Sequence, residues 1–316
     1  MPKVSIIIPV YGVEKYIERC ARSLFEQTLD DLEYLFIDDC TPDKSIDILK
    51  NVLEEYPHRK NQVIIHRMEK NSGQAAVRKW GMLNATGNYV IHCDSDDWVD
   101  VTMYEKMYNK AICEHADIAI CDFCHAFEDG HQKIERGLKN PENYLSDMMY
   151  SKISWSLWNK MIRKELYEKD IVYPVENVGE DMALVLQISR YVSKVVYVRD
   201  LFYYYYFNTT SIMNTYTAEK TKERYRQMCC NVDIVESAYN HDSKLSAFKP
   251  NLNAIKLYCK VLLVPALDES NISDWNKKYK EVGFCTIINP NVRFRYKSIY
   301  LLQKLHLYSY VEKILS

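Results

Sequence analysis

The sequence is poor in glycine, with only eight glycines among 316 residues. No two of them stand in Gly-x-Gly spacing, and no Gly-Lys-Ser or Gly-Lys-Thr triplet occurs. The sequence therefore lacks both the glycine fingerprint of dinucleotide-binding domains and the phosphate loop of NTPases. If the chain binds a nucleotide, other residues must do so.

Other features are missing as well. The formal net charge is −2, so nothing in the composition indicates a nucleic-acid partner. No apolar stretch approaches the roughly 20 residues needed to span a bilayer. A strand-like run follows directly after Met1-Pro2-Lys3, so we expect no signal peptide and a cytoplasmic protein. Ten cysteines in a chain of this length do not form the dense pattern of a disulfide framework.

Short apolar runs alternate with amphipathic segments over the first 125 residues. The predicted strands are Val4–Val10, Leu32–Ile37, Val63–His66, Asn88–Cys93 and Asp117–Phe123. The predicted helices are Glu14–Gln27, Ser45–Tyr56, Gln74–Ala85 and Thr102–His115. Each connection is long enough for a crossover, which predicts an α/β fold with a mostly parallel sheet and helices on both faces.

The rhythm changes after Phe123. We expect a hairpin or loop over Glu128–Lys139 and helices over Glu142–Tyr150 and Met182–Tyr191. Strands are predicted over Lys194–Val198 and Phe202–Phe207. The end of the chain is predicted to be helical over Ala218–Tyr239, Leu245–Leu267 and Ser298–Leu315. A boundary near Tyr216 then separates a domain at 1–216, with halves at about 1–125 and 126–216, from a helical region at 217–316.

Three carboxylates follow the fourth predicted strand within four positions: Asp94, Asp96 and Asp97. Like charges so close together need a cation or strong hydrogen-bond donors. Oxygen ligands in Asp-x-Asp spacing suit Mg²⁺ or Mn²⁺, which typically shares its shell with substrate phosphates. The alternative is a solvated acidic turn before the next helix, with Asp100 or Thr102 as N-cap.

Further candidates stand at the same predicted sheet edge. Asp38 and Asp39 close the second strand, where carboxylates can accept hydrogen bonds from a base or from ribose hydroxyls. Arg78 lies one turn into the helix that follows Gly73, and a helix N-terminus together with an arginine favours an anion. These residues predict a nucleotide diphosphate site.

Five ordered motifs over roughly Pro2 to Met213 resemble the family-2 glycosyltransferases, which have the GT-A fold. They are Val4 to Tyr11 with Ser23-Leu24 and Glu33 to Asp39, Asn71-Ser72-Gly73 to Arg78, Asp94-Ser95-Asp96-Asp97, Gly179-Glu180-Asp181, and Trp158-Asn159-Lys160 with the Tyr203 to Tyr206 run ahead of Ser211-Ile212. The last group is similar to the version found in bacterial surface-polysaccharide enzymes.

The resemblance implies the role of each motif residue. A nucleotide-sugar donor, which we expect to be UDP-linked, would be bound by Pro9, Tyr11, Asp38, Asp39, Arg78, Asp94 and Ser95. Mn²⁺ or Mg²⁺ would be held by Asp94 and Asp96, with Asp97 in support. Asp181 would be the catalytic base of an inverting transfer to a hydroxyl acceptor. Trp158, Lys160 and Glu180 are candidates for contact with the sugar or acceptor, beside a purely structural role.

The resemblance also implies partners and a location. The acceptor would be a glycan or a lipid-linked glycan of the cell surface. The C-terminal helices, which include an amphipathic pattern over Tyr300 to Leu315, would pack on the domain, form a homodimer or contact the inner face of the cell membrane.

Two other classes of function stay open at this point. One is a catalytically inactive nucleotide-sugar-binding protein with the same fold. The other is a receiver-like Mg²⁺-binding phospho-switch, suggested by the pair Asp38-Asp39, although in receivers such a pair ends the first strand.

Overall fold

The structure is a computed structural model that describes residues 1–136, 138, 140–207, 217–242 and 247–308. The chain divides into two compact units. The sheet unit contains residues 1–144, 156–177 and 188–209, and the helical unit contains residues 145–155, 178–187 and 210–316. The boundary predicted near Tyr216 falls outside the described residues, so the domain limits 1–216 and 217–316 stay a prediction.

The sheet unit is built on one mixed sheet, which has nine strands within the described part of the chain. Across the sheet the order is β3 (Val63–Arg67), β2 (Leu32–Asp38), β1 (Val4–Val10), β4 (Tyr89–His92), β8 (Lys160–Arg163), β6 (Ile118–Ala126), β9 (Val195–Tyr206) and β5 (Trp98–Val99), with β7 (Gln132–Glu135) paired to β6. Strands β3, β2, β1 and β4 are parallel to one another. The predicted α/β class with a mostly parallel sheet is confirmed.

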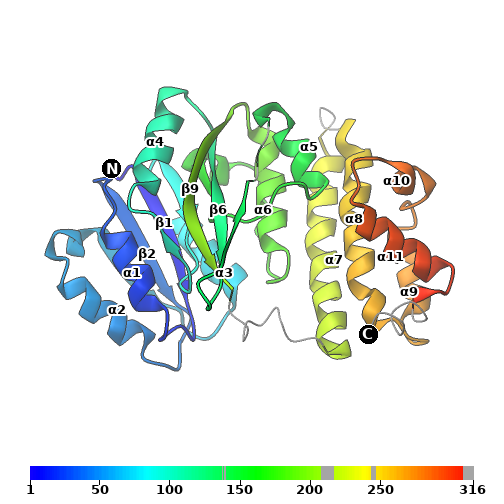
Figure 1. Cartoon of the computed structure of the whole chain (residues 1–316), viewed down its shortest axis with the longest axis horizontal. Helices are drawn as coiled ribbons and strands as arrows, with labels where there is room; N and C mark the ends of the chain where they lie inside the picture. The colour runs from blue at the N-terminus through cyan, green and yellow to red at the C-terminus, as the bar shows by residue number, and fades with distance from the viewer. Residues whose placement is uncertain (137, 139, 208–216, 243–246, 309–316) are drawn as a thin grey trace. The chain divides into compact units, whose positions relative to one another are not determined.

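Helices cover both faces of this sheet (Figure 1). Helices α1 (Ile17–Phe25), α2 (Ser45–Glu54) and α4 (Met103–Cys113) pack on the face that carries Ile6 and Ile8 of β1. Helix α3 (Gln74–Asn84) covers the other face, where a Cβ at Gly81 would lie 2.6 Å from Ile7 Cγ2. Burial on both faces explains the near-continuous apolar sequence of β1, since each buried isoleucine contributes about 1.5–3 kcal/mol.

Strand β8 was not predicted. It lies antiparallel between β4 and β6, and so interrupts the run of parallel strands. Its sequence, Lys160 to Arg163, begins and ends with a basic residue and hides the strand pattern. Lys160 is nevertheless buried, because neighbouring strands flank it on both sides.

Strand β9 is one strand where two were predicted. It pairs in parallel with β6 along its whole length, with register shifts on both sides of Asp122: Cys121 lies opposite Val198, Asp122 opposite Leu201 and Phe123 opposite Tyr203. Arg199 and Asp200 are the extra residues of the first shift and are exposed. These two polar residues interrupt the apolar pattern, which is why two separate strands were predicted. A bulge accommodates the two residues without ending the strand. The predicted hairpin after Phe123 is confirmed by the antiparallel pair of β6 and β7.

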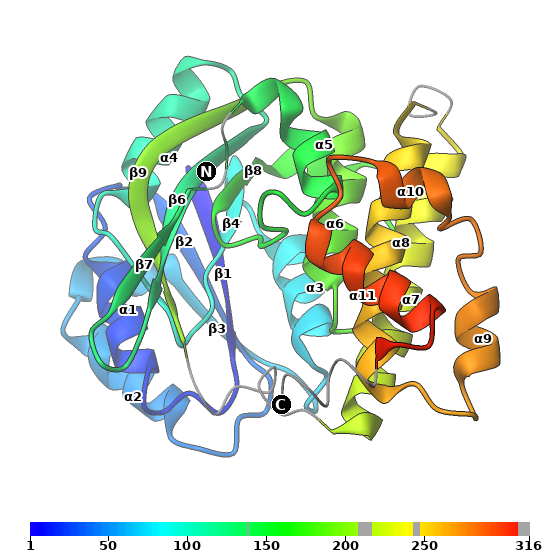
Figure 2. The ribbon, with the colours of Figure 1, turned by 45° about the vertical axis from the view of Figure 1, so that its right-hand side comes forward.

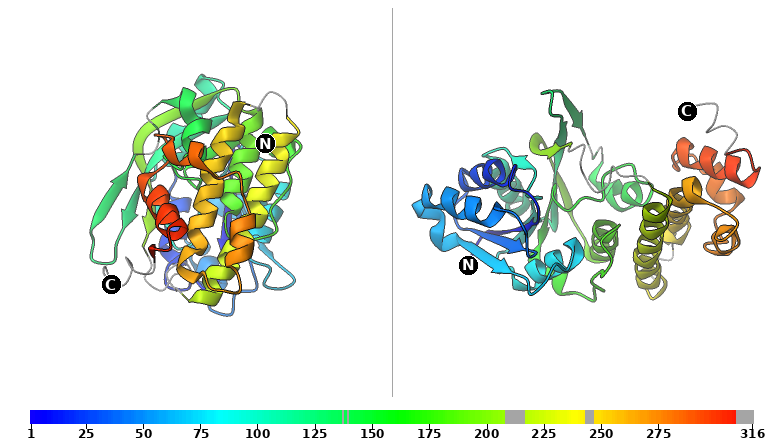
Figure 3. Two further views of the ribbon diagram at one scale, coloured as in Figure 1. Left: turned by 90° about the vertical axis from the view of Figure 1, so that its right-hand side faces the viewer. Right: turned by 90° about the horizontal axis from the view of Figure 1, so that it is seen from below.

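The helical unit holds all but one residue each of α5 (Tyr144–Met149) and α6 (Glu180–Ile188). Its remaining helices are α7 (Ala218–Asn240), α8 (Lys249–Leu263), α9 (Ile272–Lys277), α10 (Phe284–Ile288) and α11 (Phe294–Lys304). Helices α7 and α8 lie side by side, and α10 and α11 pack on α8 (Figures 2 and 3). The helix predicted over Ser298–Leu315 instead runs from Phe294 to Lys304 as α11, and residues 309–315 lie outside the described part.

Candidate active site

The carboxyl ends of the parallel strands β2 and β4 bring the predicted acidic residues to one edge of the sheet. Asp38 is the last residue of β2 and Asp39 follows it, while Asp94 stands two residues after β4. Strand β1 lies between these two strands, so its end at Val10 and the next residue, Tyr11, face the same edge. Open α/β sheets bind ligands at this edge.

Asp39 anchors the loop that leads into α3. Its Oδ1 accepts a hydrogen bond from the amide of Ser72 at 2.7 Å, and its Oδ2 accepts one from the amide of Gly73 at 2.9 Å. Gly73 has a φ of +82°, and a Cβ there would lie 2.5 Å from Asn177 Nδ2. Asn177 Oδ1 in turn accepts a hydrogen bond from the Ala75 amide at 3.0 Å. The loop is therefore held by a carboxylate at one side and an amide side chain at the other.

Asp38 is buried and compensated. Arg67 Nη1 donates to its Oδ2 at 2.8 Å, and the Thr41 amide donates to its Oδ1 at 2.7 Å. Gly12, in the turn after β1, donates its amide to Thr41 Oγ1 at 2.8 Å. Asp38 thus links the ends of β1, β2 and β3, which bound the predicted nucleoside site.

The three carboxylates after β4 have different environments. Asp94 accepts a hydrogen bond on Oδ1 from Nη2 of the buried Arg78 at 2.8 Å, and its side chain stays 21% exposed. Asp97 is fully buried, and accepts hydrogen bonds from the Tyr203 hydroxyl at 2.6 Å and from the Tyr206 amide at 2.7 Å. The cluster is therefore no solvated turn, because one carboxylate faces an arginine and another is enclosed by β9.

Burial and mutual repulsion change the acidity of this cluster. Burial raises the pKa of Asp96 to about 6, and the neighbouring Asp94 adds to the shift. Burial also raises the pKa of Asp97 well above its usual range, against the hydrogen bonds from Tyr203 and Tyr206. A raised carboxyl pKa indicates that negative charge is under-compensated here, which a bound cation would relieve.

Residues of α1 and β1 also form contacts with the segment that carries these acids. Arg19 of α1 donates from Nη2 to the carbonyl oxygen of Asp96 at 2.9 Å. Its guanidinium carbon lies 3.8 Å from the ring centroid of Trp98 and 4.8 Å from that of Tyr206. Ser95 Oγ donates to the Pro9 carbonyl oxygen at 2.6 Å. The segment after β4 is therefore tied to α1, β1 and β9.

The donor set fits a divalent cation that is only partly bound by protein. Among the described residues, no group of three or more His, Cys, Asp or Glu side chains is arranged to hold a metal. Asp94 and Asp96 offer carboxylate oxygens in Asp-x-Asp spacing, and a cation held by two carboxylates leaves ligand positions for phosphate oxygens. The role of Asp94, Asp96 and Asp97 toward a metal stays a prediction.

Two of the three candidates for sugar or acceptor contact lie in the sheet unit and are packed. The Trp158 ring stacks on that of Tyr203, with centroids 4.3 Å apart and planes at 12°. Lys160 Nζ donates to the Ser156 carbonyl oxygen at 2.7 Å and to Asn159 Oδ1 at 2.9 Å. Both side chains are buried, which supports the structural alternative; a contact with the sugar stays a prediction.

Glu180 and Asp181 are the first two residues of α6, in the helical unit. Gly179 before them has a φ of +85°, and a Cβ there would lie 2.7 Å from Met228 Sδ of α7. The tight packing explains a glycine at this position. The roles of Asp181 as base and of Glu180 as a contact stay predictions.

Arg19 and Arg67 are site residues that the sequence did not single out, and Tyr203 was named only as part of the motif run Tyr203 to Tyr206. Arg19 and Tyr203 lie 77 and 106 positions away along the chain from the acids that they contact. Within the part of the chain that the structure describes, the two-residue β5 is the one strand beyond β9 in the sheet. No local pattern marks Tyr203, because its neighbours Tyr204, Tyr205 and Tyr206 look the same.

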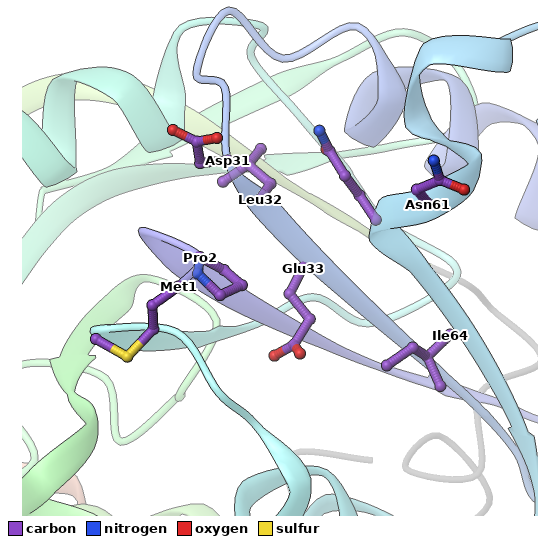
Figure 4. A pocket seen from close by; sticks show the side chains of 8 residues that line it. Met1, Pro2, Asp31, Leu32, Glu33, Asn61 and Ile64 are labelled. Carbon is purple, nitrogen blue, oxygen red and sulfur yellow. The ribbon is translucent and has the colours of Figure 1, made fainter.

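A cavity of about 290 Å³ lies elsewhere, at the amino ends of β1, β2 and β3 (Figure 4). It is lined by Met1, Pro2, Asp31, Leu32, Glu33, Asn61, Gln62 and Ile64. Because the acidic residues stand at the carboxyl ends of the same strands, this cavity is not part of the candidate site. No helix in the described ranges is both long enough and apolar enough to cross a bilayer.

Comparison with known proteins agrees with this geometry. The chain is 27% identical over 295 residues to the putative glycosyltransferase EpsH of Bacillus subtilis, covering 89% of this chain and 82% of EpsH. Its fold is similar to that of residues 1–349 of TarS from S. aureus, solved in complex with UDP-GlcNAc, with a TM-score of 0.58 at 17% identity over 96% of this chain and 92% of that solved chain. It is also similar to a mannosyltransferase from Pyrobaculum calidifontis, solved with GDP-Man and Mn²⁺, with a TM-score of 0.59 at 14% identity over 99% and 87% of the two chains.

The family model described as Glycosyl transferase family 2 matches residues 5–178, more than half of the chain. These residues include the ends of β1, β2 and β4 and the acids that follow them. The chain therefore belongs to glycosyl transferase family 2 and is a glycosyltransferase.

Proposed function

We propose that this chain transfers a sugar, with inversion, from a UDP-sugar to a hydroxyl of a glycan or lipid-linked glycan acceptor in cell-surface polysaccharide biosynthesis. The observation that carries the proposal is the set of acids at one sheet edge: Asp38 at the end of β2, Asp39 directly after it, and Asp94 and Asp96 after β4. A solved relative in fold binds UDP-GlcNAc, which supports a UDP-linked donor. Family membership argues against the receiver-like alternative.

Different residues at the sheet edge would bind different parts of the nucleotide-sugar donor. Asp39 and Asp38, with Pro9 and Tyr11 beside them, would bind the nucleoside. Arg78, whose guanidinium already contacts Asp94 at 2.8 Å, would face the phosphates. A divalent cation bound by Asp94 and Asp96 would neutralise the charge that develops on the departing diphosphate; the Mn²⁺ in a protein of similar fold supports this choice.

The chemical step needs one base from the protein. The acceptor oxygen would form a bond to the anomeric carbon while the bond from that carbon to the diphosphate oxygen breaks. The bonding electron pair would leave with the diphosphate, and Asp181 would take the proton of the acceptor hydroxyl. Attack on the face opposite the leaving group gives inversion in a single displacement, in contrast to glycosidases that protonate the leaving group with a second carboxyl.

A thermal-shift screen tests the proposal. UDP, GDP and their sugars are added to the full chain with and without Mn²⁺, and donor hydrolysis is measured alongside. We expect a UDP-sugar with Mn²⁺ to raise Tm most, and Asp96→Asn to lose the Mn²⁺-dependent part of the rise. Asp200→Asn, an exposed carboxylate on β9, is the matched control and should behave as the native chain. A rise with GDP alone would overturn the UDP assignment, and no hydrolysis of any donor would favour the inactive-binder alternative.

A further inference from the structure

Helices α10 and α11 of the helical unit expose several large apolar side chains. Phe284 of α10 is 76% exposed and Phe294 of α11 is 82% exposed. The exposed apolar residues of this region are Phe284, Ile288, Phe294, Leu301, Leu305 and Leu307. We call them the α10–α11 face. Apolar side chains exposed singly are ordinary, but a group of this kind marks an interaction surface.

Three of these exposed apolar residues form one stripe. Phe294 and Leu301 of α11 and Leu305, the C-cap residue that follows it, stand at i, i+7 and i+11, which places them on the same side of a helix. Tyr300 lies on another side and is buried, with its hydroxyl donating to the Val282 carbonyl oxygen at 3.0 Å. Helix α11 lies against α8 (Figure 2). It therefore buries Tyr300 on one side and exposes the apolar stripe on another.

The same region carries positive charge without negative charge. Between Glu281 and Glu312 the sequence has no Asp or Glu, but it has four basic residues, Arg293, Arg295, Lys297 and Lys304. Lys304 Nζ contacts Asn276 Oδ1 at 2.7 Å, and Lys297 Nζ contacts the Asn289 carbonyl oxygen at 2.5 Å. Neither partner is charged, so these contacts leave the positive charge uncompensated.

Three lysines elsewhere in the helical unit are paired with acids, whereas Lys260 of α8 donates to the backbone carbonyl oxygens of Trp275 and Lys278. Lys256 contacts Glu236 at 2.6 Å, Lys278 contacts Asp233 at 2.6 Å and Lys222 contacts Asp268 at 2.6 Å. Within the part of the chain that the structure describes, none of the four basic residues near the α10–α11 face forms an ion pair. The stretch between Glu281 and Glu312 therefore carries four basic residues and no acid of its own.

We propose that the α10–α11 face binds the surface of an anionic lipid bilayer. An exposed apolar stripe in a stretch that also exposes Arg293 and Arg295 and contains no acid matches the boundary between acyl chains and anionic headgroups. A second copy of the same face is a poorer partner, because two such faces would bring four basic residues of each copy together without an acid. The proposal goes beyond the transfer reaction and does not depend on it.

Sedimentation with vesicles tests this proposal. The full chain is mixed with vesicles of 30% phosphatidylglycerol in phosphatidylcholine, and with vesicles of phosphatidylcholine alone, without donor or metal. We expect the chain to sediment with the anionic vesicles, and binding to fall at 1 M salt, where charges are screened within about 3 Å. Arg295→Gln should weaken binding about fivefold, the effect of one basic residue near an anionic surface.

The apolar contribution is tested with a triple variant, Phe294→Ser with Leu301→Ser and Leu305→Ser. We expect binding to fall at least about tenfold, since each side chain loses apolar burial. The matched control replaces three exposed apolar residues of the sheet unit, Ile64, Leu83 and Val175, by serine; it should bind as the native chain. Circular dichroism and Tm show that both variants fold.

Three results would overturn the proposal. The first is that the native chain stays in the supernatant when anionic vesicles are sedimented. This result can be interpreted without any variant. The second is equal loss of binding in the triple variant and its control. The third is a dimer in sedimentation velocity that the triple variant dissociates, because a second copy would then occupy the face. Failure of the donor screen would leave vesicle binding unaffected, so the two proposals fail independently.

Discussion

The hydroxyl of Tyr203 joins the two ends of the acidic segment after β4. It donates to Asp97 Oδ2 at 2.6 Å and accepts a hydrogen bond from the Asp94 amide at 3.0 Å. Tyr203 lies on β9, which pairs with β6. Both strands come well after β4 in the sequence. One buried tyrosine therefore sets the conformation of the segment that is proposed to hold the metal.

Removing this hydroxyl should destabilise the fold. Tyr203→Phe leaves Asp97 buried with one donor fewer, and we expect the free energy of unfolding to fall by about 1–3 kcal/mol. Urea unfolding followed by circular dichroism measures the change. Tyr204→Phe is the control, because no hydrogen bond of its hydroxyl is described and its ring still stacks on Trp98 at 5.2 Å. Equal loss in both variants would show that the hydroxyl of Tyr203 has no special role.

Asp96 should give stability a specific pH dependence. Its pKa is raised to about 6 in the folded chain, against about 3.9 for an ordinary aspartate. The folded chain binds this proton more tightly than the unfolded chain, so its contribution to the free energy of unfolding falls as pH rises from about 4 to about 6. Above about pH 6 the full unfavourable contribution of the ionised Asp96 carboxylate to the free energy of unfolding is present.

Comparison of the native chain with Asp96→Asn isolates this contribution. Urea unfolding from pH 4 to pH 8 should show the native chain losing stability relative to the variant across the window. At pH 7.5, Mn²⁺ should raise the stability of the native chain and leave the variant unchanged. Parallel pH curves for the two proteins would contradict the assigned environment of Asp96.

Gly73→Ala should disturb the loop that Asp39 holds. The new Cβ would lie 2.5 Å from Asn177 Nδ2, and the φ of +82° adds backbone strain. Gly130→Ala is a control with the same φ of +82° and open space around the Cβ. We expect Gly73→Ala to lower Tm by more than Gly130→Ala and to weaken binding of the nucleotide, measured by calorimetry. If both variants lose the same Tm, the contact with Asn177 is unimportant.

Asp181→Asn should abolish transfer and keep donor binding. A general base contributes about 10²–10⁴-fold to a rate, so turnover should fall by that factor while the thermal shift with donor is unchanged. Glu219→Gln, an exposed carboxylate in the first turn of α7, is the matched control for a charge at a helix start. Near-normal turnover of Asp181→Asn would show that another group takes the proton.

Much of the sheet unit could be predicted because its signals are local. The apolar run Val4–Val10 coincides with β1, and the acids that end β2 and follow β4 mark the carboxyl edge of the sheet. Helix starts were also readable, since the predicted starts at Ser45, Gln74 and Ala218 match α2, α3 and α7. The apolar period of a helix or strand and the acids at a strand end involve residues that are close in sequence. The sequence alone therefore shows both.

The sequence by itself determined the parallel half of the sheet, the carboxylates at its edge and the family motifs that they belong to. Only the tertiary structure decided that β8 lies between β4 and β6, that Tyr203 encloses Asp97, and that Arg19 binds the Asp96 carbonyl oxygen. The physical reason is that the two hydrogen bonds join residues 77 and 106 positions apart. Such contacts form because strand order brings the residues together, and strand order is set by packing of the whole sheet.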